Sequence, residues 1–531
     1  MLFRSGIDSP RPASQRAAAL VLTAALLTGA AFPAFADTYY IENGDITISA
    51  GESGNDVTQN NVTTKNDTDT IITNSDKATA SSHTVTIDAG NDKVEVTLKD
   101  VNIDTSSRNK AAVSVTGSGN TTIKLDGDNA LKSDTSRSGI YGSGSLTISG
   151  GENDSLTAQG GSGANGISSS GSLTISGGTV TANGDDGGRG ISSSGRVTIS
   201  GGSTVTAKGG SGTISGGDGI CSSGGVTISG GSTVTANGGN GGRLVGGDGI
   251  RSSGGVTISG GSTVTANGGN GGSIGGGSGI YSNGSLTISG GTVNANGGNG
   301  NSGSSNGGNG IISFDHVAIS GGTVNAAGGN GGNGSRSDVG NGIISSVIDL
   351  SGSLELTAKA GSPNGKALSQ AGRELELDTI KDKLGPGAKV TTTDADGKVI
   401  KQVSIPRPVE PEGPVIPEDS SSSSDGGSSA PSAPVSSIPG LTVTDKSGAV
   451  ISYTSTQSGN TLTVCVGRFT ASLRASLAAL RQLRAEGIET ITFQTILCST
   501  TLSVDELLAM GGEDAEAVLT HRSTDSSLTV G

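Results

Sequence analysis

Two aspartates, Asp218 and Asp248, hold matching places in consecutive copies of a repeat, each two residues before an isoleucine. If the copies stack, the two carboxylates lie about one strand spacing, ~4.8 Å, apart. Carboxylates this close repel each other unless a proton or a cation lies between them. Ca²⁺ prefers such oxygen ligands, so the pair is a candidate calcium site completed by backbone carbonyls. The alternative is a turn column, where Asp, Asn and Ser are favoured for their own backbone hydrogen bonds.

Three further features depend on the same stacking. Arg189 holds the place equivalent to Asp218 one copy earlier and can pair with that carboxylate. Arg251 and Tyr281 directly follow the landmark isoleucine in consecutive copies, so an outward-facing column makes them neighbours that can contact a sugar. A column after the third apolar run can hydrogen bond along the axis as a structural ladder. Its members are Asn183, Lys208, Asn237, Asn267 and Asn296, and it is broken at Ala327.

The element that must position these residues is the repeat, which runs from about residue 139 to 356 with a period of about 30 residues. One copy reads GIRSSGGVTISGGSTVTANGGNGG and holds three short alternating runs separated by glycine turns. Such short runs cannot bury a core alone, so stacked copies must share one interior of Ile, Val and Leu columns. The pattern predicts an all-β fold, a right-handed parallel β-helix with three short strands per coil. A disordered glycine-rich linker has no reason to keep phase, and a propeller needs longer strands.

The loop between the third run and the next landmark varies most in length from copy to copy. Variation confined to one loop of each coil maps insertions to one face, which is often the binding face of a repeat protein.

Composition shifts divide the chain into six parts. Basic residues precede an apolar run that ends in AFA at Ala36, which is typical of an export signal. The predicted parts are a signal peptide (1–36), an N-terminal cap with the first coils (37–138), the repeat β-helix (139–356), a C-terminal cap region (357–405), a Pro/Ser-rich disordered linker (406–439) and a small α+β domain (440–531).

The last part contains helix and cysteine signals. Thr470 can cap a helix over ASLRASLAALRQLRAEG, and Ser503 can cap a second over VDELLAM. The segments GLTVTDKSG, TLTVCVG and ETITFQT are predicted strands. Cys465 and Cys498 lie in or beside predicted strands and can form a disulfide in an oxidising compartment. Two buried thiols are the alternative, and Cys221 is expected to be a small apolar filler of its column.

Charge and composition limit the function classes. The net charge of −14 becomes −16 once a signal peptide with three arginines and one aspartate is removed. An acidic, exported chain without tryptophan is a poor nucleic-acid binder. No other apolar run could span a bilayer, so we expect no membrane insertion. The predicted location is secreted or extracellular, or held at a cell surface by partners.

Catalysis has little support in the sequence. The three histidines, His83, His316 and His521, are scattered and have no nucleophile–base arrangement around them. We therefore expect a non-catalytic protein. The alternatives are a β-helix polysaccharide lyase or hydrolase, and a surface adhesin or spacer that presents the C-terminal domain.

The segment VEVTLKDVNID, then AAVSVTGSGNTTIKLDGDNAL, then repeats of GSLTISGGTVTA resemble secreted Firmicutes carbohydrate-binding domain-containing proteins. These include a calcium-containing parallel β-helix type that binds acidic plant polysaccharide and cellulose. The resemblance covers roughly Tyr39 to Leu356 and implies a polysaccharide partner, with calcium as the only expected cofactor. An acidic protein needs a bridging cation to bind an acidic glycan, and Ca²⁺ accepts carboxylates from both sides. Few aromatics, with 5 Tyr, 6 Phe and no Trp, disfavour a neutral glycan.

Overall fold

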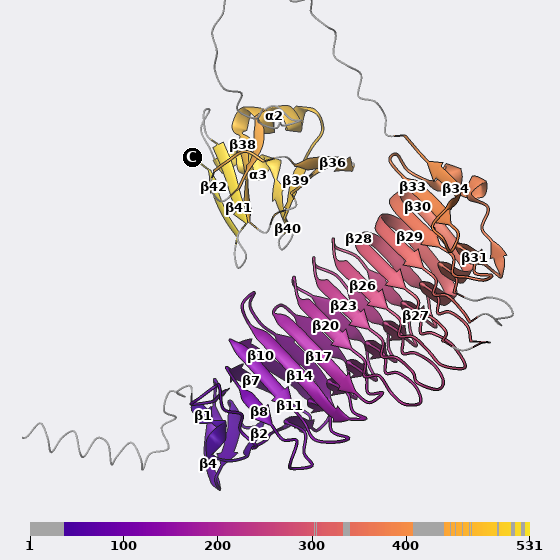
Figure 1. The fold of residues 1–531 in the computed structure, drawn as a ribbon. Coiled ribbons are helices and arrows are strands. Elements are labelled where there is room, and N and C mark those ends of the chain that lie inside the picture. The colour runs from indigo at the N-terminus through magenta and orange to yellow at the C-terminus, as the bar shows by residue number, and fades with distance from the viewer. Residues whose placement is uncertain are drawn as a thin grey trace, which may run out of the picture.

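The computed structural model is nearly all β, with 53% of residues in strands and 6% in helices. It describes residues 37–301, 303, 305–332, 340–406, 440–445, 448–451, 453–458, 460–466, 468, 470–495, 499–510, 516–521 and 526–530. A β-solenoid of about 14 turns runs from β1 (Thr38–Tyr40) to β34 (Val399–Ser404), as Figure 1 shows. The predicted parallel repeat fold is confirmed. The predicted signal peptide, and all of the predicted linker except Pro406, lie outside the described residues.

Three parallel ladders form the faces of the solenoid. The first face contains β2 (Ile46–Ala50), β6 (Val85–Asp88), β9 (Val113–Thr116), β12 (Ile140–Gly142), β15 (Ile167–Ser169), β18 (Ile191–Ser193), β21 (Ile220–Ser222), β24 (Ile250–Ser252), β27 (Ile280–Ser282) and β31 (Leu368–Gln370). The second face contains β1, β5 (Ile71–Thr73), β7 (Lys93–Lys99), β10 (Asn120–Asp126), β13 (Ser145–Ser149), β16 (Leu173–Ser176), β19 (Val197–Ser200), β22 (Val226–Ile228) and β25 (Val256–Ile258). The third face contains β8 (Asn102–Asp104), β11 (Asp128–Lys132), β14 (Ser155–Ser162), β17 (Thr179–Asp185), β20 (Thr204–Lys208), β23 (Thr233–Asn237), β26 (Thr263–Asn267) and β33 (Lys389–Thr393).

Three longer strands bend around the corners between faces. β28 (Leu286–Asn296) belongs to the second and third faces. β29 (Ile311–Ala327) and β30 (Ile343–Lys359) pair with each other along all three faces. The coils of β29 and β30 are therefore each formed by one long strand rather than by three short strands separated by turns.

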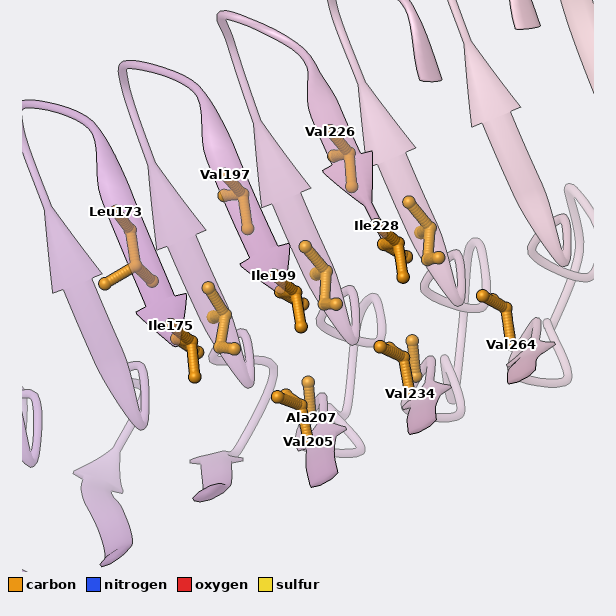
Figure 2. Close-up of a cluster of buried hydrophobic side chains, with 14 of the residues drawn as sticks. Leu173, Ile175, Val197, Ile199, Val205, Ala207, Val226, Ile228, Val234 and Val264 are labelled. Atoms are coloured by element: carbon orange, nitrogen blue, oxygen red, sulfur yellow. The ribbon is translucent and has the colours of Figure 1, made fainter. Parts of the chain in front are cut away.

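Equivalent residues of consecutive coils lie side by side, as the repeat predicts. Ile220 is paired with Ile250, and Ile250 with Ile280, in unbroken register. The landmark isoleucines point inward and are fully buried, and the apolar residues of the other two runs fill the same interior. Figure 2 shows this stacking for Leu173, Val197 and Val226 and for the valines of the third face. Each buried aliphatic side chain contributes about 1.5–3 kcal/mol, so the columns carry most of the stability.

The predicted asparagine ladder is confirmed over three coils. Asn267 Nδ2 donates to Asn237 Oδ1 at 2.8 Å, and Asn296 Nδ2 donates to Asn267 Oδ1 at 2.8 Å. A second ladder, not predicted, lies in the loops, where the backbone N–H of Asn270 donates to Asn240 Oδ1 at 2.8 Å and later coils repeat the contact.

Replacing Asn267 with alanine should lower the free energy of unfolding by about 1–2 kcal/mol, because two amide hydrogen bonds are lost. Asn283→Ala is the matched control, because that side chain is exposed and makes no hydrogen bond to another described residue. Thermal unfolding followed by circular dichroism measures both, and equal midpoints for the two variants would contradict the ladder.

The loops between the third and first faces are packed through glycine backbones. Gly247 N donates to Gly239 O at 2.8 Å, and Gly269 N donates to Gly247 O at 2.8 Å. The same contacts continue from coil to coil through Gly188, Gly210, Gly217, Gly239, Gly247, Gly269, Gly277, Gly298, Gly308 and Gly329, which we call the glycine stack. A Cβ atom on Gly247 would lie 1.9 Å from Gly217 O, so no other residue fits. The sequence suggested a binding face for these loops and did not predict this packing.

Antiparallel hairpins lie at both ends of the solenoid. At the start, β2 pairs with β3 (Asn55–Gln59), which pairs with β4 (Val62–Asp67), next to the short helix η1 (Ile41–Asn43). At the end, β31 pairs with β32 (Arg373–Glu374) and β33 with β34, and η2 (Leu377–Lys383) lies between these pairs in sequence. Hairpins here keep the last parallel strands from being open edges.

The C-terminal residues have a core of their own. One sheet contains β35 (Leu441–Thr444), β38 (Ala471–Ser476), β41 (Glu516–His521) and β42 (Ser526–Val530). The other contains β36 (Thr454–Ser458), β37 (Thr461–Cys465), β39 (Thr490–Gln494) and β40 (Ser499–Ser503). Two helices, α2 (Leu477–Ala485) and α3 (Val504–Met510), pack with them.

The predicted start of the first helix in this region is wrong. Residues Ala471–Ser476 form strand β38, with alternate residues buried, and the helix begins at Leu477. Ser476, not Thr470, caps it through a bond from Ala479 N to Ser476 Oγ at 3.2 Å. Ala471, Leu473 and Ala475 alternate with polar residues, and that period of two prevails over the helical spacing of the leucines. The cap at Ser503 is confirmed by the 3.4 Å bond from Glu506 N to Ser503 Oγ.

Candidate functional site

The outward-facing residues of the first face form one continuous column, as predicted. Each member directly follows a landmark isoleucine and is paired in register with the next. We call this column the first-face stripe, and it contains Tyr141, Ser168, Ser192, Cys221, Arg251, Tyr281, Ile312 and Ile344.

Arg251 and Tyr281 are neighbours on this stripe, which confirms the predicted adjacency. The Arg251 guanidinium carbon lies 4.4 Å from the Tyr281 ring centroid, a cation–π contact. The Phe314 ring lies 5.5 Å from the Tyr281 ring, and Phe314 is 58% exposed. We call Arg251, Tyr281 and Phe314 the aromatic cluster. Sequence reasoning missed Phe314 because it lies three residues after the landmark Ile311, outside the predicted columns.

Asp218 and Asp248 lie on adjacent coils, where they hydrogen bond along the axis. Asp248 N donates to Asp218 Oδ1 at 2.9 Å, and Ser278 N donates to Asp248 Oδ1 at 2.6 Å. Asn165 Oδ1 accepts from Arg189 N at 2.8 Å in the same way. The side chains of this column therefore bond to the backbone of the following coil rather than to their own turn.

The cation between the two carboxylates is an arginine. Arg251 Nη2 lies 2.8 Å from Asp248 Oδ2, and Arg251 Nε lies 3.5 Å from Asp218 Oδ1. Arg189 Nε donates to Asp218 Oδ2 at 3.2 Å, so the predicted pairing of Arg189 with Asp218 is confirmed. The contact at Asp248 Oδ2 is an ion pair without hydrogen-bond geometry, because no N–H is directed closely enough at that oxygen.

These contacts fit a guanidinium better than the predicted calcium ion. Each carboxylate oxygen of Asp218 and Asp248 already has an N–H donor or a guanidinium beside it. A Ca²⁺ ion bound by both carboxylates would have to displace Arg251. Within the described ranges, no group of three or more His, Cys, Asp or Glu side chains is placed to hold a metal ion.

Asp248 is the most deeply buried carboxylate of this cluster. Burial raises the pKa of Asp248, the Arg251 charge opposes that shift, and the nearby Asp218 charge adds to it. Arg251 therefore stabilises the ionised form of Asp248 in buried surroundings that favour the protonated form.

A groove lies at the N-terminal end of the same stripe. Its floor is the outer side of β6, β9, β12 and β15, where Thr86, Ser114, Tyr141 and Ser168 point outward, with Thr84 at the edge. Its wall is formed by stacked loop residues 109–111, 136–138 and 163–165. The volume is 740 Å³, within the range of about 300–1,000 Å³ typical of ligand sites.

The groove carries positive charge in an acidic protein. Lys110 and Arg137 line it, and of the described residues lining it none is Asp or Glu. Arg137 Nε donates to Asn109 Oδ1 at 3.3 Å, and within the described chain Arg137 has no acidic partner. The chain as a whole has a net charge of −14, so the groove differs in sign from the average surface.

One carboxylate next to the groove is shared by several cations. Asp45 accepts hydrogen bonds from Arg108 Nη1 at 2.7 Å and from Lys110 Nζ at 3.0 Å, and His83 Nδ1 lies 3.1 Å away. Burial alone would raise the pKa of Asp45, but hydrogen bonds from Arg108, Thr84, Lys110 and His83 hold it well below its usual range. Two permanent positive charges therefore face a single negative one, which leaves an excess of positive charge.

Sequence reasoning missed the groove because its wall needs three loops from different coils. Tyr141 directly follows the landmark Ile140 and so belongs to the predicted column, but nothing in the repeat distinguishes its role from that of the serines at the next two places. The available signal was the cluster of Arg108, Lys110 and Arg137 in a chain where acids outnumber bases by 47 to 33.

The cysteine predictions have separate outcomes. Cys221 is half-buried on the stripe, and burial raises the pKa of its thiol to about 11, which suits an unreactive filler. Cys465 Sγ lies 3.5 Å from Gln494 Oε1, and burial raises the pKa of this thiol also. Its predicted partner Cys498 lies outside the described residues, so the disulfide stays a prediction.

The three histidines lie in unrelated surroundings. His316 Nε2 lies 3.3 Å from Asp349 Oδ2, whereas His83 is beside Asp45. His521 is buried, and its Nε2 lies 2.9 Å from Thr500 Oγ1.

The fold and the groove together define the chain as a parallel β-solenoid with a polar, positively charged groove on its first face. No family model, no curated protein and no solved structure matches the chain. In the part of the chain that the structure describes, the helices are all too short or too polar to cross a bilayer.

Proposed function

We propose that the protein is a secreted, non-catalytic polysaccharide-binding solenoid whose groove holds an acidic glycan. The single observation that carries this proposal is the groove itself. It combines hydroxyl and amide groups, which suit sugar hydroxyls, with Tyr141 for contact with a sugar ring and two cations for a carboxylate or sulfate.

The cations of the groove are complementary to an acidic glycan. A bridging calcium ion was expected from the sequence to supply this complementarity. Lys110 and Arg137 can bind an anionic group directly, and hydrogen bonds to charged groups contribute about 1.5–3 kcal/mol. Binding should therefore weaken as salt is added, because exposed ion pairs are screened.

Lys110→Ala and Arg137→Ala should each weaken binding to polygalacturonate at least about tenfold, since about 1.4 kcal/mol corresponds to a factor of ten. Titration calorimetry on the full mature chain measures this. Lys124→Ala is the matched control, because it removes the same charge from β10 on the second face, where Lys124 pairs with Glu95.

A chelator arm separates the two kinds of acidic-glycan binding. Direct recognition by the two groove cations predicts unchanged affinity in EDTA. Affinity lost in EDTA and unaffected by Lys110→Ala and Arg137→Ala would replace the groove by a calcium bridge. Unsaturated or new reducing ends in the same mixtures would instead support the lyase or hydrolase alternative.

A second candidate function is presentation of the C-terminal domain by the solenoid. The observation that favours it is the separate hydrophobic core of residues 441–530, which shares no member with the solenoid core. Deleting residues 440–531 distinguishes the two functions, because a glycan-binding solenoid keeps its affinity and a spacer loses its function. We also propose that the coils wind right-handed, since crossovers between parallel strands of one sheet are nearly always right-handed.

A further inference from the structure

The groove and the aromatic cluster lie on the same stripe. Tyr141 lines the groove. Arg251 and Tyr281 belong to both the stripe and the aromatic cluster, in which Phe314 packs against Tyr281. The stripe steps from Tyr141 to Tyr281 through five consecutive strand pairings in unbroken register. At one strand spacing of ~4.8 Å per coil, the two places are roughly 24 Å apart along the solenoid axis.

The path between them is free of large side chains on the stripe. Between Tyr141 and Arg251 the stripe has only small side chains, namely Ser168, Ser192 and Cys221. Arg189 and Arg251 border this path, and each side chain is a little over 40% exposed. Both guanidiniums are partly balanced by Asp218 and Asp248, so the path is polar and close to neutral.

The aromatic cluster has the properties of a sugar-stacking surface. Phe314 has most of its surface open to solvent and packs against the half-buried Tyr281 ring, which is held in turn by Arg251. Because Phe314 packs against a ring that is itself held in place, it loses less freedom when a ligand covers it than an isolated side chain would. Aromatic faces attract the apolar faces of other rings and cover much apolar area.

We propose that the first-face stripe binds one extended acidic polysaccharide chain lying along the solenoid axis, with its anionic groups in the groove and a distant sugar ring on Phe314 and Tyr281. This inference rests on the proposed function of the groove and adds a second subsite and a direction for the chain. Two linked contacts on one ligand raise affinity only if the ligand is long enough to reach both. Oligosaccharides shorter than the separation of the subsites therefore use the groove alone.

The test measures affinity against oligogalacturonides of increasing length with the full mature chain. Wild-type affinity should rise by at least about tenfold once the oligomer spans both places, and then level off. Phe314→Ser should remove that rise and leave the affinity for short oligomers unchanged. Ile400→Ser is the matched control, because it removes an equally exposed aliphatic side chain from β34 in the C-terminal cap.

The outcomes separate this inference from the proposed function. If Phe314→Ser binds long oligomers as wild type does, while Lys110→Ala and Arg137→Ala still lose affinity, the second subsite is wrong and the groove stands. If the Lys110 and Arg137 variants bind every length as wild type does, the groove itself is wrong. An equal loss for short and long oligomers in Phe314→Ser would indicate a change in the fold and also overturn the subsite.

Discussion

Replacing Gly247 with alanine should destabilise the solenoid by more than about 4 kcal/mol, beyond the usual range for single substitutions. The added Cβ would lie 1.9 Å from Gly217 O and 2.4 Å from Gly217 C. Those atoms belong to the backbone of the preceding coil, which is itself hydrogen bonded within the glycine stack, so neither side can move away alone. Urea unfolding followed by circular dichroism measures the loss.

Gly303→Ala is the control for this substitution. Gly303 belongs to the same kind of glycine-rich loop, but a Cβ there meets no atom within 4 Å and its backbone is not left-handed. That variant should stay within about 0.5 kcal/mol of wild type. If Gly247→Ala and Gly303→Ala unfold at the same urea concentration, the glycine stack is not packed as described.

Replacing Arg251 with methionine should cost about 3 kcal/mol at about pH 9, where Asp248 is ionised in wild type, because it leaves the buried carboxylate without its cation. The value is at the low end for broken buried pairs, since the Arg251 side chain is 43% exposed and its charge is partly screened. Methionine keeps a long side chain beside Tyr281, so the substitution mainly removes charge. Arg196→Met removes an arginine whose Nη1 donates to Thr227 Oγ1 at 3.3 Å, and it should change stability by less than about 0.5 kcal/mol.

The cost of Arg251→Met should depend on pH. Burial raises the pKa of Asp248 above its ordinary value of 3.8, so the folded chain keeps this proton to higher pH than the unfolded chain. Stability contributed by this group is therefore complete below pH 3.8 and falls as the pH rises from there. In wild type this loss levels off near the folded pKa of about 7, whereas without Arg251 the pKa is raised further and the loss continues, so the difference from wild type grows above about pH 7 and shrinks below it.

A second substitution tests this explanation. Adding Asp248→Asn to Arg251→Met should restore most of the lost stability and remove its pH dependence, because an amide oxygen can accept the same bond from Ser278 N. Asn165 and Asn309 already do this at equivalent places of other coils. A double variant as unstable at about pH 9 as Arg251→Met would show that the charge of Asp248 is not the cause.

The sequence by itself determined the solenoid and its columns. The apolar runs alternate with a period of two and keep a constant phase, so Ile220, Ile250 and Ile280 can be buried together only by parallel stacking in register. The same register makes Arg251 the neighbour of Tyr281, and Asp218 the neighbour of Asp248. Contacts along the axis therefore follow from the repeat alone, because each residue meets its own equivalent.

The tertiary structure decided the contacts that cross from one column to another. Arg251 reaches back to Asp248 and Asp218 and takes the place expected for calcium, which depends on side-chain length and direction rather than on spacing. The groove needs loops of unequal length from three coils to lie in one wall beside Tyr141. The repeat specifies what lies above and below each residue, but the loops are set by backbone packing between coils, which only the folded chain shows.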